Sequence, residues 1–214
     1  MTALQRSGGF LALSNDCAIV ACMSWLSDLR ADVSRYEHCN RASALRVCAT
    51  EQGLWALTQY RLARAVYASS LRPAVRLPLL TGLYAWRKGI EVTTGICLPH
   101  TAAIGPGTYL GHYGPIIVNN GAVIGEGCNI SHLVTIGAGG HGAKAGVPVI
   151  GDHVYIATGA VVVGHITVGD RAGIGANCVV AQDIPAGAVV RPATVVVKED
   201  VKTQTVMAQP PDAP

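Results

Sequence analysis

Two histidines have the surroundings of chemically active residues. His112 lies in the segment Gly111-His112-Tyr113-Gly114, and His132 ends the later segment Asn129-Ile130-Ser131-His132. Glycines on either side of His112 let the backbone approach a ligand closely and leave the imidazole ring exposed. A neutral imidazole with a pKa near ~7 can take the proton of a hydroxyl group while that oxygen attacks an electrophile. The alternative is a structural histidine that hydrogen-bonds to a neighbouring segment.

Other reactive side chains give no comparable pattern. The seven cysteines are an odd number and form no CxxC pair, so we predict neither a disulfide framework nor a zinc knuckle. Reduced thiols are what a cytoplasmic protein would have. His132 and His141 lack the close spacing that holds zinc, so no metal site is predicted. The net charge of +3 is too small to indicate a nucleic-acid partner.

A six-residue repeat must position these histidines. From Val92 onward an aliphatic side chain returns at every sixth position, with one two-residue shift and one glycine-rich insertion, Gly137–Pro148. The repeated aliphatic positions are Val92, Leu98, Ile104, Leu110 and Ile116, then Val118, Ile124, Ile130 and Ile136, then Ile150, Ile156, Val162, Val168, Ile174 and Val180. This spacing predicts short strands joined by tight corners, with three strands closing one coil of a prism. A narrow shaft of stacked aliphatics also explains a composition with one Phe and 25 Gly.

The repeat also relates the two histidines to each other. The interval from His112 to His132 equals three hexapeptides plus the two-residue shift, which is close to one full coil. Residues one coil apart lie above one another in such a prism. We therefore expect His132 to stack close to His112.

The part of the chain before the repeat favours helices. Ser27–Asp32 offers N-caps before an amphipathic segment, and Gln52–Tyr67 places apolar residues at helical spacing, with Arg61 and Arg64 as its polar members. Phe10–Leu26 is apolar but interrupted by polar residues and followed by no clear cleavage site, so a signal peptide is not predicted. No uncharged run reaches the ~18 residues of a membrane span.

These patterns predict three regions. Residues 1–89 form an α-helical N-terminal region, residues 90–192 the β-helix, and residues 193–214 a C-terminal tail. The segment 1–90 carries 11 basic and 5 acidic side chains, while the remainder carries 5 and 8. The basic first region could contact an anionic membrane surface, but a solvated helix surface explains the same charge.

The repeat and its motifs resemble those of hexapeptide-repeat acyltransferases, and most closely the serine acetyltransferase-like O-acetyltransferases, including those of polysaccharide gene clusters. The resemblance rests on motifs between Ile104 and Asp152: Ile104-Gly105-Pro106-Gly107, Gly111-His112-Tyr113-Gly114, Asn129-Ile130-Ser131, Val134-Thr135-Ile136-Gly137 and Pro148-Val149-Ile150-Gly151-Asp152. Segments 29–32 and 59–63 add weaker support. It implies a mainly β fold, a left-handed parallel β-helix preceded by a small α-helical region.

The resemblance also implies the chemistry. Acetyl-CoA would be a co-substrate rather than a tightly bound cofactor, and its acetyl group would pass directly to an acceptor hydroxyl. The family's general base falls on His112. His132 could orient this base, bind the acceptor, or simply stack beside His112. The coenzyme would lie along small corner residues and under the inserted loop, with Lys144 near a phosphate. The expected coenzyme-binding residues are Gly137, Ala138, Lys144, Ala157, Thr158, Gly159, Gly175 and Ala176.

Two departures from the family bear on the acceptor. Serine acetyltransferases carry an Asp where this chain has Gly111, and an Arg-His-Pro triplet where it has Gly146-Val147-Pro148. A serine acceptor brings two charges that each need a counter-charge. Tyr113, Asn119, Asn120 and Ser131 are neutral and suit sugar hydroxyls. The sequence therefore favours a saccharide or glycan precursor, with free serine as the alternative. Asp32 and Glu126 are candidates for the carboxylate that supports His112.

Two hypotheses of other classes use the same fold. A γ-carbonic-anhydrase-like zinc enzyme would need three histidines around the metal, and a catalytically silent β-helix would act as a scaffold. The acetyltransferase is favoured over both. Its active sites would lie between neighbouring subunits, so we expect a homotrimer.

Overall fold

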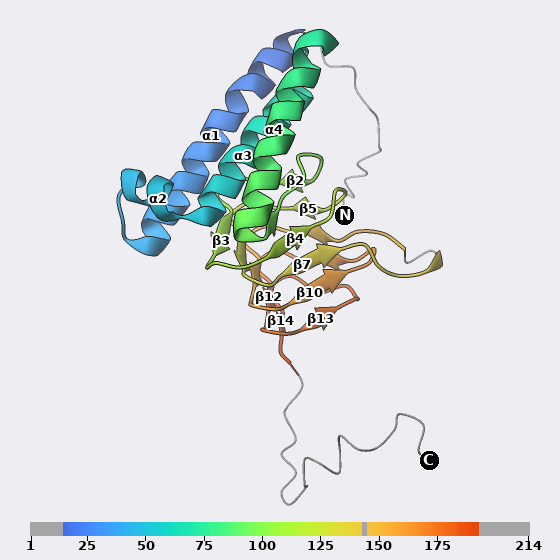
Figure 1. Ribbon diagram of the computed structural model, residues 1–214. Coiled ribbons are helices and arrows are strands. Elements are labelled where there is room, and N and C mark those ends of the chain that lie inside the picture. Colours follow the sequence, from blue (N-terminus) through green and yellow to red (C-terminus); the bar gives the residue numbers. More distant parts are fainter. Residues whose placement is uncertain (1–14, 143–144, 193–214) are drawn as a thin grey trace, which may run out of the picture.

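The computed structural model describes residues 15–142 and 145–192, with side chains from residue 25 onward. Four helices gather at one end of a β-solenoid whose coils stack away from them (Figure 1). The helices are α1 (Asn15–Asn40), α2 (Ala44–Thr50), α3 (Gln52–Ala68) and α4 (Pro73–Thr94). The predicted tail, residues 193–214, lies outside the described residues. Within the described part of the chain, no helix is both long enough and apolar enough to cross a membrane.

The solenoid has three faces, each a parallel sheet. Sheet A holds β1 (Ile96–Cys97), β4 (Ile116–Val118), β7 (Thr135–Gly137), β10 (Val161–Val163) and β13 (Val179–Val180). Sheet B holds β2 (Ala103–Ile104), β5 (Val123–Ile124), β8 (Val149–Ile150) and β11 (Thr167–Val168). Sheet C holds β3 (Tyr109–Gly111), β6 (Asn129–Ser131), β9 (Tyr155–Ile156), β12 (Gly173–Ile174) and β14 (Val189–Val190). The chain visits A, B and C in turn, so the predicted three-sided parallel prism is confirmed.

The six-residue spacing determines which side chains point inward. Val161 pairs with Val179, three hexapeptides later. Thr135 pairs with Val161 across a longer interval, because the inserted loop lengthens that coil. Ala103 pairs with Val123, three hexapeptides and the two-residue shift later. From Leu98 to Val180 every repeated aliphatic residue is buried, as predicted.

The repeat begins later than the sequence indicates. Val92 continues the six-residue spacing, but it lies in α4 and 85% of it is exposed. The helix persists until Gly95, which takes a left-handed conformation (φ 76°) and ends it. The predicted boundary between residues 89 and 90 therefore lies inside α4.

The helical region differs from the sequence prediction mainly in α1 and α4. The expected N-caps at Ser27–Asp32 lie inside α1, which already contains Asn15. Pro73 occupies the first turn of α4, where its missing N–H costs nothing, and Pro78 is accommodated within the helix. Helix α3 agrees with the prediction and is buried on most sides, because α1, α4 and strand β3 all pack against it.

Candidate active site

His112 lies at the corner where the chain leaves sheet C. It follows β3 directly, its side chain is exposed, and its backbone has φ +67°. Residues other than glycine adopt this left-handed conformation infrequently, and such strain persists only where the surroundings impose it. Among the described residues His112 makes no hydrogen bond or ion pair. Its ring is therefore available to an incoming hydroxyl group.

His132 lies directly beside His112 in the next coil. Gly111 pairs with Ser131 in the parallel register of β3 and β6, so the two histidines follow their strands at matching positions. Their ring centroids are 5.6 Å apart and the rings are nearly perpendicular, at 86°. The predicted stacking of the two histidines is thus confirmed.

The burial of one ring nitrogen of His132 favours one tautomer of its imidazole. Its Nδ1 atom is buried and has no hydrogen-bond partner within the described residues. A neutral ring with its proton on Nε2 leaves no buried N–H group unsatisfied. This tautomer can meet His112 or a ligand with an N–H donor.

Most of the predicted coenzyme-binding residues lie on the same edge of the prism as His112. We call the line of corners between sheet C and the following sheet A strand the C–A edge. Ala157, Thr158 and Gly159 follow β9, while Gly175 and Ala176 follow β12. Tyr113 lies beside His112, and Ser131 lies at the end of β6. The C–A edge therefore combines two histidines in the first coils with small residues in the later ones.

The remaining predicted residues lie on the next edge, between sheets A and B. Asn119 and Asn120 follow β4, and Gly137 and Ala138 lie at the end of β7. Strand β4 separates Asn119 from His112, and the Asn119 side chain accepts a hydrogen bond from the Gly121 N–H at 3.0 Å. Within one chain, Tyr113 and Ser131 therefore lie on the same edge as His112, and Asn119 and Asn120 lie on the next edge. Lys144 lies outside the described residues.

The inserted loop leaves the prism at this second edge. Gly139 and Gly146 form an antiparallel bridge at its base. A hollow of about 230 Å³ lies beside it, lined by residues that include Gly140, His165 and Asp183. Within one chain, the width of sheet A thus separates the base of the loop from the two histidines.

Neither candidate carboxylate supports His112. Asp32 is fully buried in α1 and accepts hydrogen bonds from Arg61 and from the Thr108 backbone N–H. Glu126 is exposed, and its Oε1 lies 3.8 Å from Nε2 of His153. His153 and His165 are exposed at corners of the solenoid, whereas His100 is half-buried against Tyr67.

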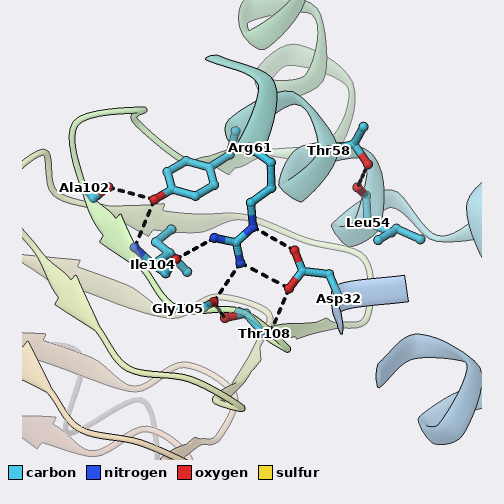
Figure 2. Close-up of polar contacts among 9 residues, drawn as sticks. Asp32, Leu54, Thr58, Arg61, Ala102, Ile104, Gly105 and Thr108 are labelled. Carbon is cyan, nitrogen blue, oxygen red and sulfur yellow. Dashed lines mark hydrogen bonds and ion pairs between the residues drawn. The ribbon is translucent and has the colours of Figure 1, made fainter. Parts of the chain in front are cut away.

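Sequence reasoning missed the polar core between the helices and the solenoid. The sequence indicates Arg61 only as a polar member of its helix, yet just 3% of it is exposed and it forms an ion pair with Asp32 (Figure 2). The guanidinium also donates to the carbonyl oxygens of Ile104 and Gly105, at 2.6 and 2.7 Å. No pattern within α3 signals this role, because the partners of Arg61 come from α1 and from the first coil of the solenoid.

Two of the described thiols, those of Cys97 and Cys128, do not suit covalent catalysis. Burial raises the pKa of Cys128 to about 11, so this thiol stays protonated at neutral pH. Burial and the Glu91 carboxylate also raise the pKa of Cys97. Within the described residues, no group of His, Cys, Asp or Glu side chains could hold a metal ion.

Comparisons with known proteins place the chain in a family. No family profile matches it. Serine acetyltransferase of Helicobacter pylori is 36% identical over 135 residues, covering 63% of this chain and 74% of the relative. Serine acetyltransferase of Mycobacterium tuberculosis is 30% identical over 167 residues, covering 77% and 69%. This chain belongs to the serine acetyltransferase family. It is accordingly an acyltransferase, as its repeat and motifs predicted.

Solved structures of this family share the fold. The soybean serine acetyltransferase apoenzyme superposes with a TM-score of 0.67 at 28% identity, covering 84% of this chain and 72% of that one. Serine acetyltransferase from Brucella abortus in complex with coenzyme A gives a TM-score of 0.67 at 25% identity, covering 84% and 69%. The share of this chain that superposes on each relative is larger than the share formed by the solenoid. The superposed residues therefore include part of the helical region.

Proposed function

We propose that this chain transfers the acetyl group of acetyl-CoA to the side-chain hydroxyl of L-serine. The observation that carries the proposal is the pair His112 and His132 at the C–A edge of a chain whose relatives are serine acetyltransferases. These relatives favour serine, the alternative in the sequence analysis, over the saccharide acceptor expected there.

His112 is the proposed general base. The serine oxygen attacks the thioester carbonyl carbon, and the His112 imidazole takes the hydroxyl proton as that bond forms. The carbon–sulfur bond then breaks, and the imidazolium returns the proton to the departing CoA sulfur. No protein nucleophile takes part, in keeping with the raised pKa values of Cys97 and Cys128. His132 orients the His112 ring through its perpendicular contact.

Coenzyme A fits the later coils of the C–A edge. Ala157, Thr158, Gly159, Gly175 and Ala176 are small, so an extended pantetheine arm can approach the backbone there. The Brucella relative was crystallised with coenzyme A, which supports this ligand. Gly137 and Ala138 lie on the other edge, so they serve the coenzyme of a neighbouring subunit.

One observation favours the saccharide acceptor. A bound serine needs counter-charges for its ammonium and carboxylate groups, and none of the described neighbours of His112 on the C–A edge carries a charge. Gly111 and Gly146-Val147-Pro148 stand where the family has charged or polar residues. Tyr113 and Ser131 are the neutral groups nearest in sequence to the two histidines. A glycan hydroxyl is therefore the second candidate acceptor.

Acetyl-CoA consumption with L-serine tests the proposal. We expect release of CoA thiol at about 1–10³ s⁻¹, the ordinary range for metabolic enzymes. L-alanine, which lacks the hydroxyl group, is the matched control and should give only background hydrolysis. Turnover with neutral saccharide acceptors but none with L-serine would establish the second candidate instead.

We also propose that the enzyme is a homotrimer. Apolar side chains point outward from sheet A, where 72% of Val179 and 50% of Ile117 are exposed. Helix α4 leads into this sheet and exposes Leu77, Tyr84 and Trp86. Contact between subunits would remove these surfaces from water.

Sedimentation should therefore give about three times the 22.2 kDa of one chain. Val179→Glu would place a charge in the contact and is expected to release smaller species with reduced turnover. The matched control is Val189→Glu, a similarly exposed valine on sheet C. A stable monomer with full turnover would contradict the trimer.

A further inference from the structure

The first coil of the solenoid has no strand beneath β2 and β3, and two tyrosines replace that missing strand. Tyr60 of α3 donates its hydroxyl proton to the Ala102 carbonyl oxygen at 2.8 Å and accepts from the Ile104 N–H at 3.0 Å. Tyr36 of α1 donates to the Leu110 carbonyl oxygen and accepts from the Leu110 N–H, both at 3.0 Å. Both tyrosines are fully buried. Each side chain therefore supplies the pair of hydrogen bonds that a neighbouring strand would supply.

Several neighbouring residues fix the position of Tyr36 against β3. Its ring packs against Tyr109 with centroids 4.6 Å apart. A Cβ atom at Gly53 would overlap the Tyr36 hydroxyl and lie 2.6 Å from the Leu110 carbonyl oxygen, so only glycine lets α3 come this close. Burial raises the pKa of Tyr36 well above its ordinary value, which keeps the hydroxyl proton available for donation. The start of the strand is fixed too, because Asp32 accepts from the Thr108 N–H at 3.1 Å.

Strand β3 leads directly into the strained corner of His112. Gly111 is the only residue between Leu110 and His112. A left-handed residue at a corner holds its side chain accurately only when the strand before it is fixed. Strand β6 pairs with β3 from above and Tyr36 holds it from below, so the hydroxyl closes the open side of this strand.

We propose that Tyr36 is a positioning residue for His112, acting through both backbone groups of Leu110. The inference rests on the proposed role of His112 as the base. Tyr60 makes the same kind of bonds with β2, but that strand leads to the corner at Gly105 and away from the histidines. The two tyrosines thus make the same kind of hydrogen bonds with the first coil. Only the strand held by Tyr36 leads to His112.

Tyr36→Phe and Tyr60→Phe test the proposal as a matched pair. Each removes one buried hydroxyl and leaves one backbone N–H, that of Leu110 or of Ile104, without its partner. Tyr36→Phe also leaves the Leu110 carbonyl unpaired, whereas the Ala102 carbonyl keeps a donor in Arg64. Both should lower the melting temperature, by about 2–8 °C for a protein of this size, with Tyr60→Phe at the lower end of that range. Only Tyr36→Phe should lower kcat, by about 10–100-fold, because small displacements of a catalytic group have effects of that order. The KM for acetyl-CoA should be unchanged, since the coenzyme residues lie in later coils.

The same substitution in a His112→Ala background shows whether Tyr36 acts through the base. In that background Tyr36→Phe should have no further effect on kcat, because the group that it positions is gone. Multiplicative losses, or an equal loss of kcat in Tyr60→Phe, would overturn the proposal. Unchanged turnover in His112→Ala alone would instead refute the assignment of the base.

A second measurement needs no acceptor. In protein labelled with carbon-13 at its seven histidines, His112→Ala identifies the His112 ring resonance. Tyr36→Phe should shift or broaden that resonance, and Tyr60→Phe should leave it in place. A His112 resonance unaffected by Tyr36→Phe would contradict the positioning role, even if the acceptor proved to be something other than serine.

Discussion

His112→Ala should lower kcat by about 10²–10⁴ while the protein stays folded, the usual effect of removing a general base. The physical reason is the weak nucleophilicity of an alcohol at neutral pH, which makes proton removal part of the barrier. The side chain is exposed and makes no hydrogen bond within the described residues, so its loss creates no cavity and no orphaned partner. Circular dichroism and the melting temperature should therefore match those of the unsubstituted enzyme.

His153→Ala is the matched control for this experiment. His153 is also an exposed corner histidine with a left-handed backbone, φ +56°, but it lies between sheets B and C. Its substitution should leave kcat within about twofold, since surface changes away from a site have small effects. His132→Ala should fall between the two, because it removes an orienting contact of 5.6 Å between ring centroids. A larger loss in His132→Ala than in His112→Ala would mean that the base is His132.

The repeat was predictable because it has a simple physical cause. One inward side chain per strand, three strands per coil and a shaft too narrow for Phe leave an aliphatic residue at every sixth position. Helix α3 was predictable from its apolar spacing for the same kind of reason. Val92 was misassigned because an exposed helical residue can continue a six-residue spacing by chance, and only the left-handed Gly95 marks where the solenoid begins.

The contact between the two histidines was predictable, because it depends only on the number of residues in one coil. Which edge of the prism each remaining site residue occupies was harder to predict. The interval between His112 and His132 equals the length of the first coil, so their contact followed from counting hexapeptides. Asn119, a predicted acceptor-binding residue, lies on a different edge of its own chain from His112. The repeat itself indicates this difference: His112 follows the inward residue Leu110 of one face, while Asn119 follows Val118 of the next.

The buried polar core had a different origin. Nothing in the spacing of α3 distinguishes Arg61 from a surface arginine, because its partners come from α1 and from two corners of the first coil. Helical periodicity describes one helix at a time. The need for a positive group appears only when α1 and α3 are both placed over the open end of the solenoid, where carbonyl oxygens and the Asp32 carboxylate meet.

Arg61→Leu should destabilise the fold by about 3–5 kcal/mol, the usual effect of breaking a buried ion pair. The substitution removes donors from two carboxylate oxygens and from the carbonyls of Ile104 and Gly105, all shown in Figure 2. For a chain of this size, a loss of that order lowers the melting temperature by roughly 6–20 °C. Differential scanning calorimetry measures it directly.

Arg64→Leu supplies the matched control. Arg64 also donates to solenoid carbonyls, those of His100 and Ala102, but it has no carboxylate partner and is only half-buried. It should therefore lower the melting temperature much less than Arg61→Leu. The double variant Asp32→Leu/Arg61→Leu should recover part of the loss, because no buried charge remains unpaired. Equal losses in the two single variants would contradict the central role of the ion pair.

The pH dependence of the Arg61→Leu defect follows from the forces on Asp32. Burial raises the pKa of the Asp32 carboxyl, while Arg61 and the backbone N–H of Thr108 lower it, with burial the larger influence. Removing Arg61 raises the folded-state pKa further above the unfolded value of about 3.9. A group with a raised folded pKa favours folding at pH values below its unfolded pKa, and this contribution is lost as the pH rises through the folded pKa. The difference in melting temperature between Arg61→Leu and the unsubstituted enzyme should therefore be largest at neutral pH and narrow as the pH falls toward the unfolded pKa. A difference that widened with acidification would show that the Asp32 carboxyl is not the group left uncompensated.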